Sequence, residues 1–350
     1  MQRLDSFASQ NQVVDLSPWL QYYAFDVVGM FTFDKKFGFL EQGKDIDSIM
    51  STIEFILAYS AIIGQIPALH LLLLGNPLLI KLMPPMEQWN QIVQFTLKAM
   101  RERAEMKSGG EYTVSDTDGK DFLSKLASPK SSEDEKMNVR DLVIALAGNV
   151  FAGSDTTAIA LRAIVYYLCR YPECLAKLAD EITKLDKDSK LSSPINFKEA
   201  SAIPYLSAVI KEAMRLHPSV GLILERHVPP QGVEIEGHFL PNRTVVGVNP
   251  WVTGRNAEMF PQPNEFRPER WLEVPEQELR AMDNLLEFNF GAGARKCLGR
   301  HMAWIEMMKV IPELIRRFEI EFADPEKDWH VTNHWFVQQE GLVCKLRRRQ

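Results

Sequence analysis

The sequence is poor in cysteine and has no excess of positive charge. Its 350 residues include four cysteines, which are spaced too irregularly for a disulfide framework or a zinc knuckle, so we expect a reducing compartment. There are 40 lysines and arginines against 46 aspartates and glutamates, which gives no reason to expect a nucleic-acid partner. A hydrophobic content of 46%, with 19 glycines and 20 prolines, excludes collagen-like and disordered classes.

The N-terminus lacks the basic and then apolar stretch of a secretory signal, so nothing there directs export. Between Phe55 and Ile80 the chain has no Asp, Glu, Lys or Arg, and this stretch is long enough to span a bilayer. However, Gly64, Pro67 and Pro77 divide it into shorter pieces, and exposed breaks in hydrocarbon would leave backbone groups unpaired. We therefore predict a pair of short helices that are buried or dip into a membrane interface.

Hydrophobic periodicity predicts a mostly helical chain. One long helix is expected over Val139–Arg170 and ends before Tyr171 and Pro172. We interpret the polar stretch Lys107–Lys136 as a mobile surface connection. Further helices are expected over Leu16–Phe33, Asp45–Ser60, Pro85–Glu105, Glu173–Leu185, Ile203–His217 and Met302–Phe318, and short strands within Gly232–Val248 and Trp335–Leu346. This pattern predicts a mainly α fold with small β-sheets.

The densest motif runs from Phe290 to Gly299 and places glycines and an arginine around Cys297, just before an apolar helix. A dinucleotide fingerprint fits poorly because Lys296 stands where the third glycine belongs. A cysteine nucleophile would need a base, and His301, one turn further on, is better placed to face solvent. A metal thiolate is favoured, because glycines let the backbone approach a large flat ligand and the following helix N-terminus favours an anion.

The pattern F-x-x-G-x-R-x-C-x-G, filled by Phe290, Gly293, Arg295, Cys297 and Gly299, resembles the haem-binding loop of the cytochrome P450 family. The resemblance implies that Cys297 is the axial ligand of the haem iron and that the other four residues bind the cofactor. It also implies that Arg295 pairs with a haem propionate. The fold expected from it is the cytochrome P450 fold, mainly α with small β-sheets.

The long helix contains Ala152-Gly-Ser-Asp-Thr-Thr157, which is similar to the family's oxygen-activation motif. Read alone, the segment also suits a close helix crossing through small residues. Gly153 leaves room for a ligand beside the helix, and Asp155 and Thr156 can hydrogen-bond water. The resemblance implies that Ala152 and Gly153 contact the haem, while Asp155 and Thr156 are catalytic residues that deliver protons to dioxygen.

Two further motifs follow in the order the family has them. Glu212 and Arg215 resemble the E-x-x-R motif, and Arg270 stands in FRPERW, which resembles the P-E-R-F element. An isolated i,i+3 pair is usually a surface feature, but the resemblance implies a buried structural network of these three residues. Arg226 matches a second propionate-binding arginine. Arg255 follows a glycine where the family often has a histidine, so one haem contact departs from the pattern.

A segment near the N-terminus resembles the middle helices of fungal microsomal-type P450s, especially those similar to pisatin demethylase. Its sequence is VDLSPWLQYYAFDVVGMFTF. The resemblance implies that residues 1–350 form a partial, N-terminally truncated P450 catalytic domain, from the middle helices to the C-terminus. The membrane anchor, most of the large sheet and the W-x-x-x-R helix are expected to be missing. We expect an apolar substrate pocket lined by residues of Leu146–Gly153, Ser219–Leu224 and Asn333–Phe336.

The implied function is that of a haem-thiolate monooxygenase, which inserts one atom of O2 into a hydrophobic small molecule in fungal secondary metabolism. Its cofactors would be haem b with its iron and O2, with electrons from NADPH through NADPH-cytochrome P450 reductase. Lys296, Arg300 and His301 would supply a basic docking patch for that reductase. The expected location is the cytoplasmic face of the endoplasmic reticulum membrane, with peripheral membrane contact. The alternative is a truncated, catalytically inactive fragment with impaired haem binding.

Overall fold

The computed structural model describes residues 1–76, 78–79, 89–108, 121–128 and 137–349. They form two compact units. Unit 1 comprises Met1–Val14 and Ala160–Gln350, and unit 2 comprises Asp15–Ile159. The boundary falls inside the long helix α8 (Val139–Arg170), so each unit includes a part of it.

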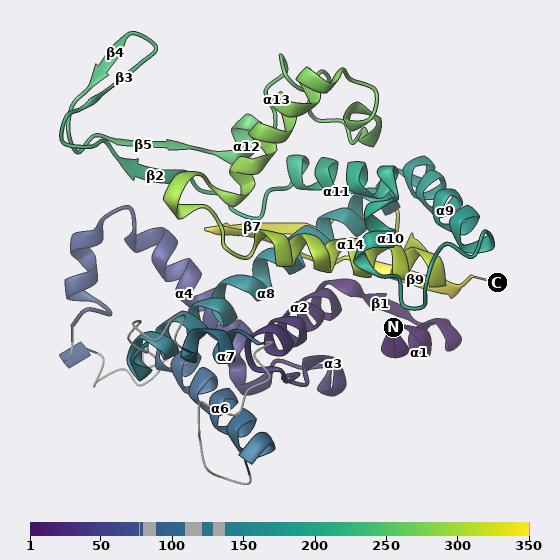
Figure 1. Ribbon diagram of the computed structural model, residues 1–350, viewed down its shortest axis with the longest axis horizontal. Helices are drawn as coiled ribbons and strands as arrows, with labels where there is room; N and C mark the ends of the chain where they lie inside the picture. The colour runs from purple at the N-terminus through teal and green to yellow at the C-terminus, as the bar shows by residue number, and fades with distance from the viewer. Residues whose placement is uncertain (77, 80–88, 109–120, 129–136, 350) are drawn as a thin grey trace. The chain divides into compact units, whose positions relative to one another are not determined.

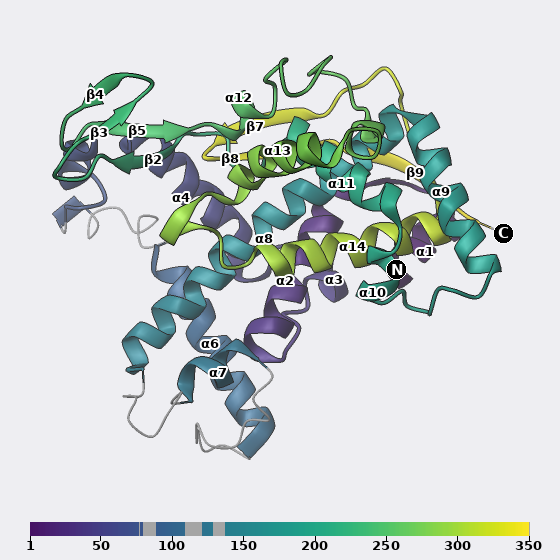
Figure 2. The same ribbon diagram turned by 45° about the horizontal axis from the view of Figure 1, so that its top comes forward.

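Unit 2 is helical in its described residues. Its α2 contacts α3, α6 and α7, and α4 packs on α6, as can be followed in Figure 2. Besides the first part of α8, the elements are α2 (Leu16–Phe33), α3 (Phe39–Gln42), η1 (Ile46–Ser48), α4 (Ile49–Ile63), η2 (Pro67–Leu72), α6 (Trp89–Ser108) and α7 (Phe122–Ala127).

Asp26 fixes the turn that leads from α2 into α3. Its buried carboxylate accepts hydrogen bonds from the backbone N–H groups of Gly38, Phe39 and Leu40 at 2.7, 3.1 and 3.0 Å. The first amides of a helix have no partner within it, so the carboxylate satisfies groups that would otherwise be buried unpaired. Phe25 stacks on Phe39 with ring centroids 4.6 Å apart. These contacts hold α2 in a defined position within unit 2.

Unit 1 combines helices with four small sheets, which Figure 1 shows in teal to yellow apart from the purple strand β1. One sheet has the strand order β1-β9-β6, and the others are the antiparallel pairs β2-β5, β3-β4 and β7-β8. The helical elements are α1 (Gln2–Ser9), α9 (Pro172–Lys187), α10 (Phe197–Ser201), α11 (Pro204–Leu216), α12 (Pro250–Thr253), η4 (Pro268–Trp271), α13 (Glu276–Leu286), η5 (Glu287–Phe290), η6 (Gly293–Arg295) and α14 (Arg300–Arg317). The strands are β1 (Val13–Asp15), β2 (Leu224–His227), β3 (Val233–Ile235), β4 (His238–Leu240), β5 (Val245–Val248), β6 (Phe318–Phe322), β7 (His330–His334), β8 (Phe336–Glu340) and β9 (Val343–Arg348).

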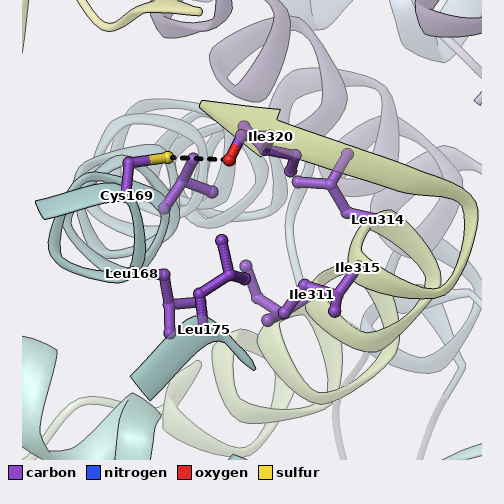
Figure 3. A pocket seen from close by; sticks show the side chains of 8 residues that line it. Leu168, Cys169, Leu175, Ile311, Leu314, Ile315 and Ile320 are labelled. Carbon is purple, nitrogen blue, oxygen red and sulfur yellow. Dashed lines mark hydrogen bonds between the residues drawn. The ribbon is translucent and has the colours of Figure 1, made fainter. Parts of the chain in front are cut away.

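The core of unit 1 is built around α11 and α14, which contact each other and both contact α9 and α10. Four elements, α8, α9, α14 and β6, surround an apolar cavity of about 10 Å3 (Figure 3). Such a volume is far below that of a pocket for a small organic molecule. Its lining residues are Val165, Leu168, Cys169, Leu175, Ile311, Leu314, Ile315 and Ile320. The cavity is therefore a packing feature of the core.

Most predicted elements are present, and the fold is mainly α with small sheets as expected. The helices predicted over Leu16–Phe33 and Val139–Arg170 have these bounds. The prediction that Lys107–Lys136 is only a connection is wrong for its middle, because Phe122–Ala127 forms α7. There Asp121 accepts a hydrogen bond from the Ser124 N–H at 2.6 Å and pairs with buried Arg103. The rest of that stretch, residues 109–120 and 129–136, lies outside the described residues.

The charge-free stretch Phe55–Ile80 contains the end of α4 and the short helix η2. Instead of being buried, several of its large apolar side chains are exposed, and Leu71 is 71% exposed. Residues 77 and 80 lie outside the description. By length and composition alone, Ile46–Ile63 and Val139–Arg170 could each cross a membrane. This is weak support for a span, since the core helix of a soluble protein passes the same criteria and half of the α8 window is buried.

Candidate functional site

The loop around Cys297 folds back on itself just before α14. The Cys297 N–H donates to the Phe290 carbonyl oxygen at 2.7 Å, which closes the loop. Gly291 and Gly293 have φ angles of 72° and 62°, a left-handed conformation that favours glycine. The Cys297 thiol is free and exposed, three residues ahead of the first residue of α14. The sequence of the loop thus presents one thiol to solvent near a helix N-terminus.

Arg226 and Arg295 are exposed in the same unit. Arg226 lies in β2, paired with Val246 of β5, and its Nη1 donates to the Glu225 backbone oxygen at 2.6 Å. Among the described residues, neither arginine forms an ion pair with a carboxylate. Two uncompensated guanidinium groups suit an anionic ligand, because arginine binds carboxylates in a bidentate manner.

The chemistry of these groups fits haem. In the described parts of the chain, no three His, Cys, Asp or Glu side chains gather as a metal site would require. A zinc centre takes three or four such ligands, whereas a haem iron can be held by one cysteine thiolate. Cys297 would supply that ligand, and Arg226 and Arg295 match the two propionates. Phe290, Gly293 and Gly299 shape the loop that carries the cysteine.

The oxygen-activation motif lies in the part of α8 that belongs to unit 2. The Thr156 Oγ1 donates to the Ala152 carbonyl oxygen at 2.8 Å, a bond to the preceding turn that is common for threonine in helices. Asp155 is buried, at 1% exposure. A Cβ on Gly153 would lie 2.9 Å from the Val28 Cγ2, so the glycine permits a close approach of α2.

Sequence reasoning missed Gln21 of α2. Its Nε2 donates to the Asp155 Oδ1 at 2.6 Å, in a buried environment. Gln21 and Val28 are seven residues apart and therefore share one face of α2. The helix periodicity of α2 was the only signal in the sequence for a face shared by Gln21 and Val28. No motif includes the glutamine.

Glu212, Arg215 and Arg270 are brought together in unit 1 and are completely or almost completely buried. The Arg215 Nη2 donates to Glu212 Oε1 at 2.8 Å and its Nε to Oε2 at 2.9 Å. The Arg270 Nε donates to Glu212 Oε1 at 2.9 Å, and the Trp271 Nε1 to Oε2 at 2.9 Å. One carboxylate thus satisfies two guanidinium groups and an indole.

Gly254 explains why the chain departs from the family pattern before Arg255. A Cβ at Gly254 would lie 2.6 Å from the Arg215 carbonyl oxygen, so a histidine has no room there. Arg255 donates from Nη2 to the Leu216 carbonyl oxygen at 2.8 Å and lies over the Trp251 ring at 4.9 Å. Its guanidinium is engaged in the scaffold beside α11.

Two of the expected lining segments adjoin within unit 1. The Gly221 N–H donates to the Trp335 carbonyl oxygen at 2.9 Å, and the Val337 N–H to the Ser219 carbonyl oxygen at 2.9 Å. A Cβ at Gly221 would lie 2.5 Å from the Asn333 side chain, so glycine is required for this approach. The third segment, Leu146–Gly153, belongs to unit 2, as do Asp155 and Thr156.

The expected basic patch is weaker than its sequence suggests. Lys296 forms an ion pair with Glu287, so its charge is compensated locally. The sequence could not reveal this pairing, because the two residues lie on either side of the glycine-rich turn. Arg300 and His301 are left to carry the positive charge, next to Leu298, which is 96% exposed.

His217, at the C-terminal end of α11, is a second residue that the motif analysis passed over. It is buried between Trp251 and Trp329, with ring centroids 5.0 Å from each. Its Nε2 lies 3.0 Å from the Val337 carbonyl oxygen. Burial lowers the pKa of His217 to about 4, because the charged imidazolium loses its hydration.

A mainly helical fold with small sheets, together with one exposed cysteine in a glycine-rich loop before a helix, agrees with the haem-thiolate class that the residue pattern of the loop resembles. Comparison with known proteins agrees with this class. The cytochrome P450 family model matches residues 1–344. The chain therefore belongs to the cytochrome P450 family.

Curated fungal relatives cover nearly all of the chain. Cytochrome P450 monooxygenase cicH of Emericella nidulans is 37% identical, over 99% of this chain and 68% of the relative. Pisatin demethylase of Fusarium vanettenii is 37% identical, over 99% and 65%. The chain thus spans about two thirds of their length. It spans 92% of cytochrome P450 monooxygenase ACRTS1 of Alternaria alternata, which is 33% identical.

A solved structure, the haem domain of cytochrome P450DA, matches with a TM-score of 0.79 at 17% identity and covers 100% of this chain and 71% of that one. At this identity the match shows the fold alone. It agrees with the mainly helical cytochrome P450 fold that the sequence predicts. Since cicH and ACRTS1 are named cytochrome P450 monooxygenases, the class of enzyme is an oxidoreductase of the monooxygenase type.

Glu212→Gln should lower the free energy of unfolding by about 3–5 kcal/mol, because two buried guanidinium groups lose their counter-charge. Urea unfolding followed by circular dichroism measures this. The matched control is Glu276→Gln, which opens the exposed ion pair with Arg280 and should change stability by less than about 1 kcal/mol. Equal effects of the two variants would contradict the role assigned to the network.

Lowering the pH from about 6.5 to about 4 should remove about 3 kcal/mol of stability through His217. The folded state resists protonation of this buried ring, so the unfolded chain takes up the proton first and stability falls with pH. The measurement is the difference in unfolding free energy between the chain and His217→Gln across this range. A difference that stays constant with pH would show that His217 does not titrate as described.

Proposed function

We propose that the chain is a haem-thiolate monooxygenase that inserts one atom of O2 into a hydrophobic small molecule of fungal secondary metabolism. The observation that carries the proposal is the exposed Cys297 thiol, held by the bond between its N–H and the Phe290 carbonyl oxygen in a loop of the family's pattern. When bound, haem b supplies a thiolate-ligated iron at which dioxygen is reduced and its O–O bond is cleaved.

The residues of the chain have distinct roles in this proposal. Cys297 would ligate the haem iron from the loop that precedes α14. Arg226 and Arg295 bind the propionates through charge-assisted hydrogen bonds. Ala152 would contact the cofactor from α8, whereas the space beside Gly153, where a ligand was expected, is taken by Val28 of α2. The network of Glu212, Arg215 and Arg270 keeps the scaffold of the cysteine loop rigid.

Asp155 and Thr156 move protons toward the oxygen site in this proposal. A carboxylate and a hydroxyl can both take part in proton transfer, and α8 supplies one of each at consecutive positions. The Thr156 hydroxyl donates to the Ala152 carbonyl oxygen. Positioned proton transfer of this kind directs dioxygen reduction toward water and product.

Electrons come from a reductase, with NADPH as the proposed donor. An acidic reductase surface would complement Arg300 and His301, and the exposed Leu298 would add apolar contact area. The substrate is proposed to be apolar, because two of the proposed lining segments, Ser219–Leu224 and Asn333–Phe336, would form a hydrophobic wall. Val220 and Phe336 pair in a β-bridge between these segments.

We also propose peripheral contact with the cytoplasmic face of the endoplasmic reticulum membrane. The support is an apolar surface at the end of α4 and along η2, which consists of Ile62, Ile66, Leu69, Leu71, Leu72, Leu73 and Leu78, all at least 36% exposed. A surface of this kind enters the boundary between lipid headgroups and acyl chains. A hydrophobic substrate dissolved in the bilayer would then meet the protein at the membrane.

The double variant Leu71→Asp, Leu72→Asp should weaken binding to phosphatidylcholine–phosphatidylserine vesicles by at least about tenfold, because two exposed leucines no longer transfer into lipid. Vesicle flotation measures the bound fraction. Val252→Asp, also at a highly exposed apolar position, serves as the control and should bind normally. Unchanged binding of the double variant would refute the membrane contact through this surface.

Cys297→Ala should abolish the red-shifted Soret band of the reduced, carbon-monoxide-bound protein, because the thiolate ligand causes that shift. The spectrum is recorded on haem-supplemented protein. Leu298→Ala, at the neighbouring exposed position, is the matched control and should retain the band. A chain that binds no haem, or a band that survives in Cys297→Ala, would overturn the proposed function and favour the inactive fragment.

A further inference from the structure

The contact between Gln21 and Asp155 joins two helices that are far apart in sequence. The Gln21 Nε2 lies 2.6 Å from the Asp155 Oδ1, and the two residues are 5% and 1% exposed. Both belong to unit 2. A buried hydrogen bond to a carboxylate is stronger than one between neutral groups, so this contact fixes the orientation of the Asp155 side chain.

The helix packing around this contact holds the donor in place. On the same face of α2, Val28 packs against α8 where a Cβ on Gly153 would come within 2.9 Å. Asp26, also in α2, anchors the start of α3 through three backbone amides. Gln21 therefore has little freedom to move away from Asp155, and its amide is a preorganised donor.

The chemical character of the donor also matters. A glutamine amide has no proton to lose and carries no charge, so it orients the carboxylate without neutralising it. A lysine or arginine at this position would form a buried ion pair and favour retention of the charged state of the carboxylate. The hydrogen bond from Gln21 therefore orients the carboxylate without adding a counter-charge of its own.

We propose that Gln21 is a positioning residue for Asp155, which holds the carboxylate in the orientation from which it delivers protons through Thr156. This inference rests on the proposed function, because Asp155 is there assigned to proton delivery. Gln21 itself does not contact substrate or cofactor in the proposal. Its contribution is the hydrogen bond at Oδ1.

A spectroscopic test needs no haem. The infrared difference spectrum between the chain and its Asp155→Asn variant isolates the carboxylate stretch of Asp155. In Gln21→Met, which keeps the side-chain length but removes the donor, this band should shift, because the hydrogen bond at Oδ1 is lost. Val28→Ala is the control, since it loosens the contact at Gly153 and keeps the amide donor. An unchanged band in Gln21→Met would overturn the inference.

The functional test uses the haem-loaded protein with a reductase, NADPH and ethoxycoumarin as a hydrophobic probe. The readouts are the hydrogen peroxide released per NADPH consumed and the solvent deuterium isotope effect on NADPH oxidation. We expect Gln21→Met to raise both several-fold, and Val28→Ala, which loosens the packing but keeps the amide donor, to raise them less. Circular dichroism and thermal unfolding verify that both variants are folded.

The outcomes separate the inference from the function on which it rests. If Asp155→Asn raises peroxide release and Gln21→Met does not, the positioning role is wrong and the proposed proton delivery by Asp155 stands. If Asp155→Asn leaves peroxide release unchanged, proton delivery by Asp155 is wrong, and the role of Gln21 falls with it. A Val28→Ala effect equal to that of Gln21→Met would assign the effect to helix packing and overturn the inference.

Discussion

Unit 1 depends on the hydrogen bonds and ion pairs that the buried carboxylate of Glu212 forms. This carboxylate receives hydrogen bonds from Arg215, Arg270 and Trp271, and thereby joins α11 to the segment that contains η4. Burial of two guanidinium groups is unfavourable unless each has a partner. Because Arg215 also donates to the carbonyl oxygens of Gly254 and Pro263, the same charge organises the backbone that follows α12.

The second constraint on the fold is the close packing of neighbouring atoms against three glycine residues. Gly254 lies against the Arg215 carbonyl oxygen, Gly221 against Asn333, and Gly153 against Val28. In each place the distance to an added Cβ would be below 3 Å, so a larger residue would force the elements apart. At Gly254 the neighbouring atom belongs to the backbone, whereas at Gly221 and Gly153 it belongs to a side chain.

The sequence predicted the secondary-structure elements and the motifs better than it predicted the side-chain contacts between them. The bounds of α2 and α8 follow from hydrophobic periodicity and from Pro172, and the Cys297 loop follows from its fixed residue pattern. The hydrogen bond between Gln21 and Asp155 and the ion pair between Lys296 and Glu287 were not predictable. The first contact depends on how two helices distant in sequence meet in space, and neither Gln21 nor Glu287 belongs to a motif. The capped helix α7 was missed because it is only six residues long and lies within a polar stretch.

Buried titratable groups in unit 1 show how the fold treats charge. Glu212 is paired with two arginines, whereas Glu306 of α14 has an Oε2 atom that is buried without a hydrogen-bond partner. Burial raises the pKa of Glu306 to about 8, so its neutral form predominates in the folded chain at neutral pH. Its contribution to stability is therefore lost as the pH rises from about 4.5 to about 8. Cys297 differs from both, since its thiol is exposed.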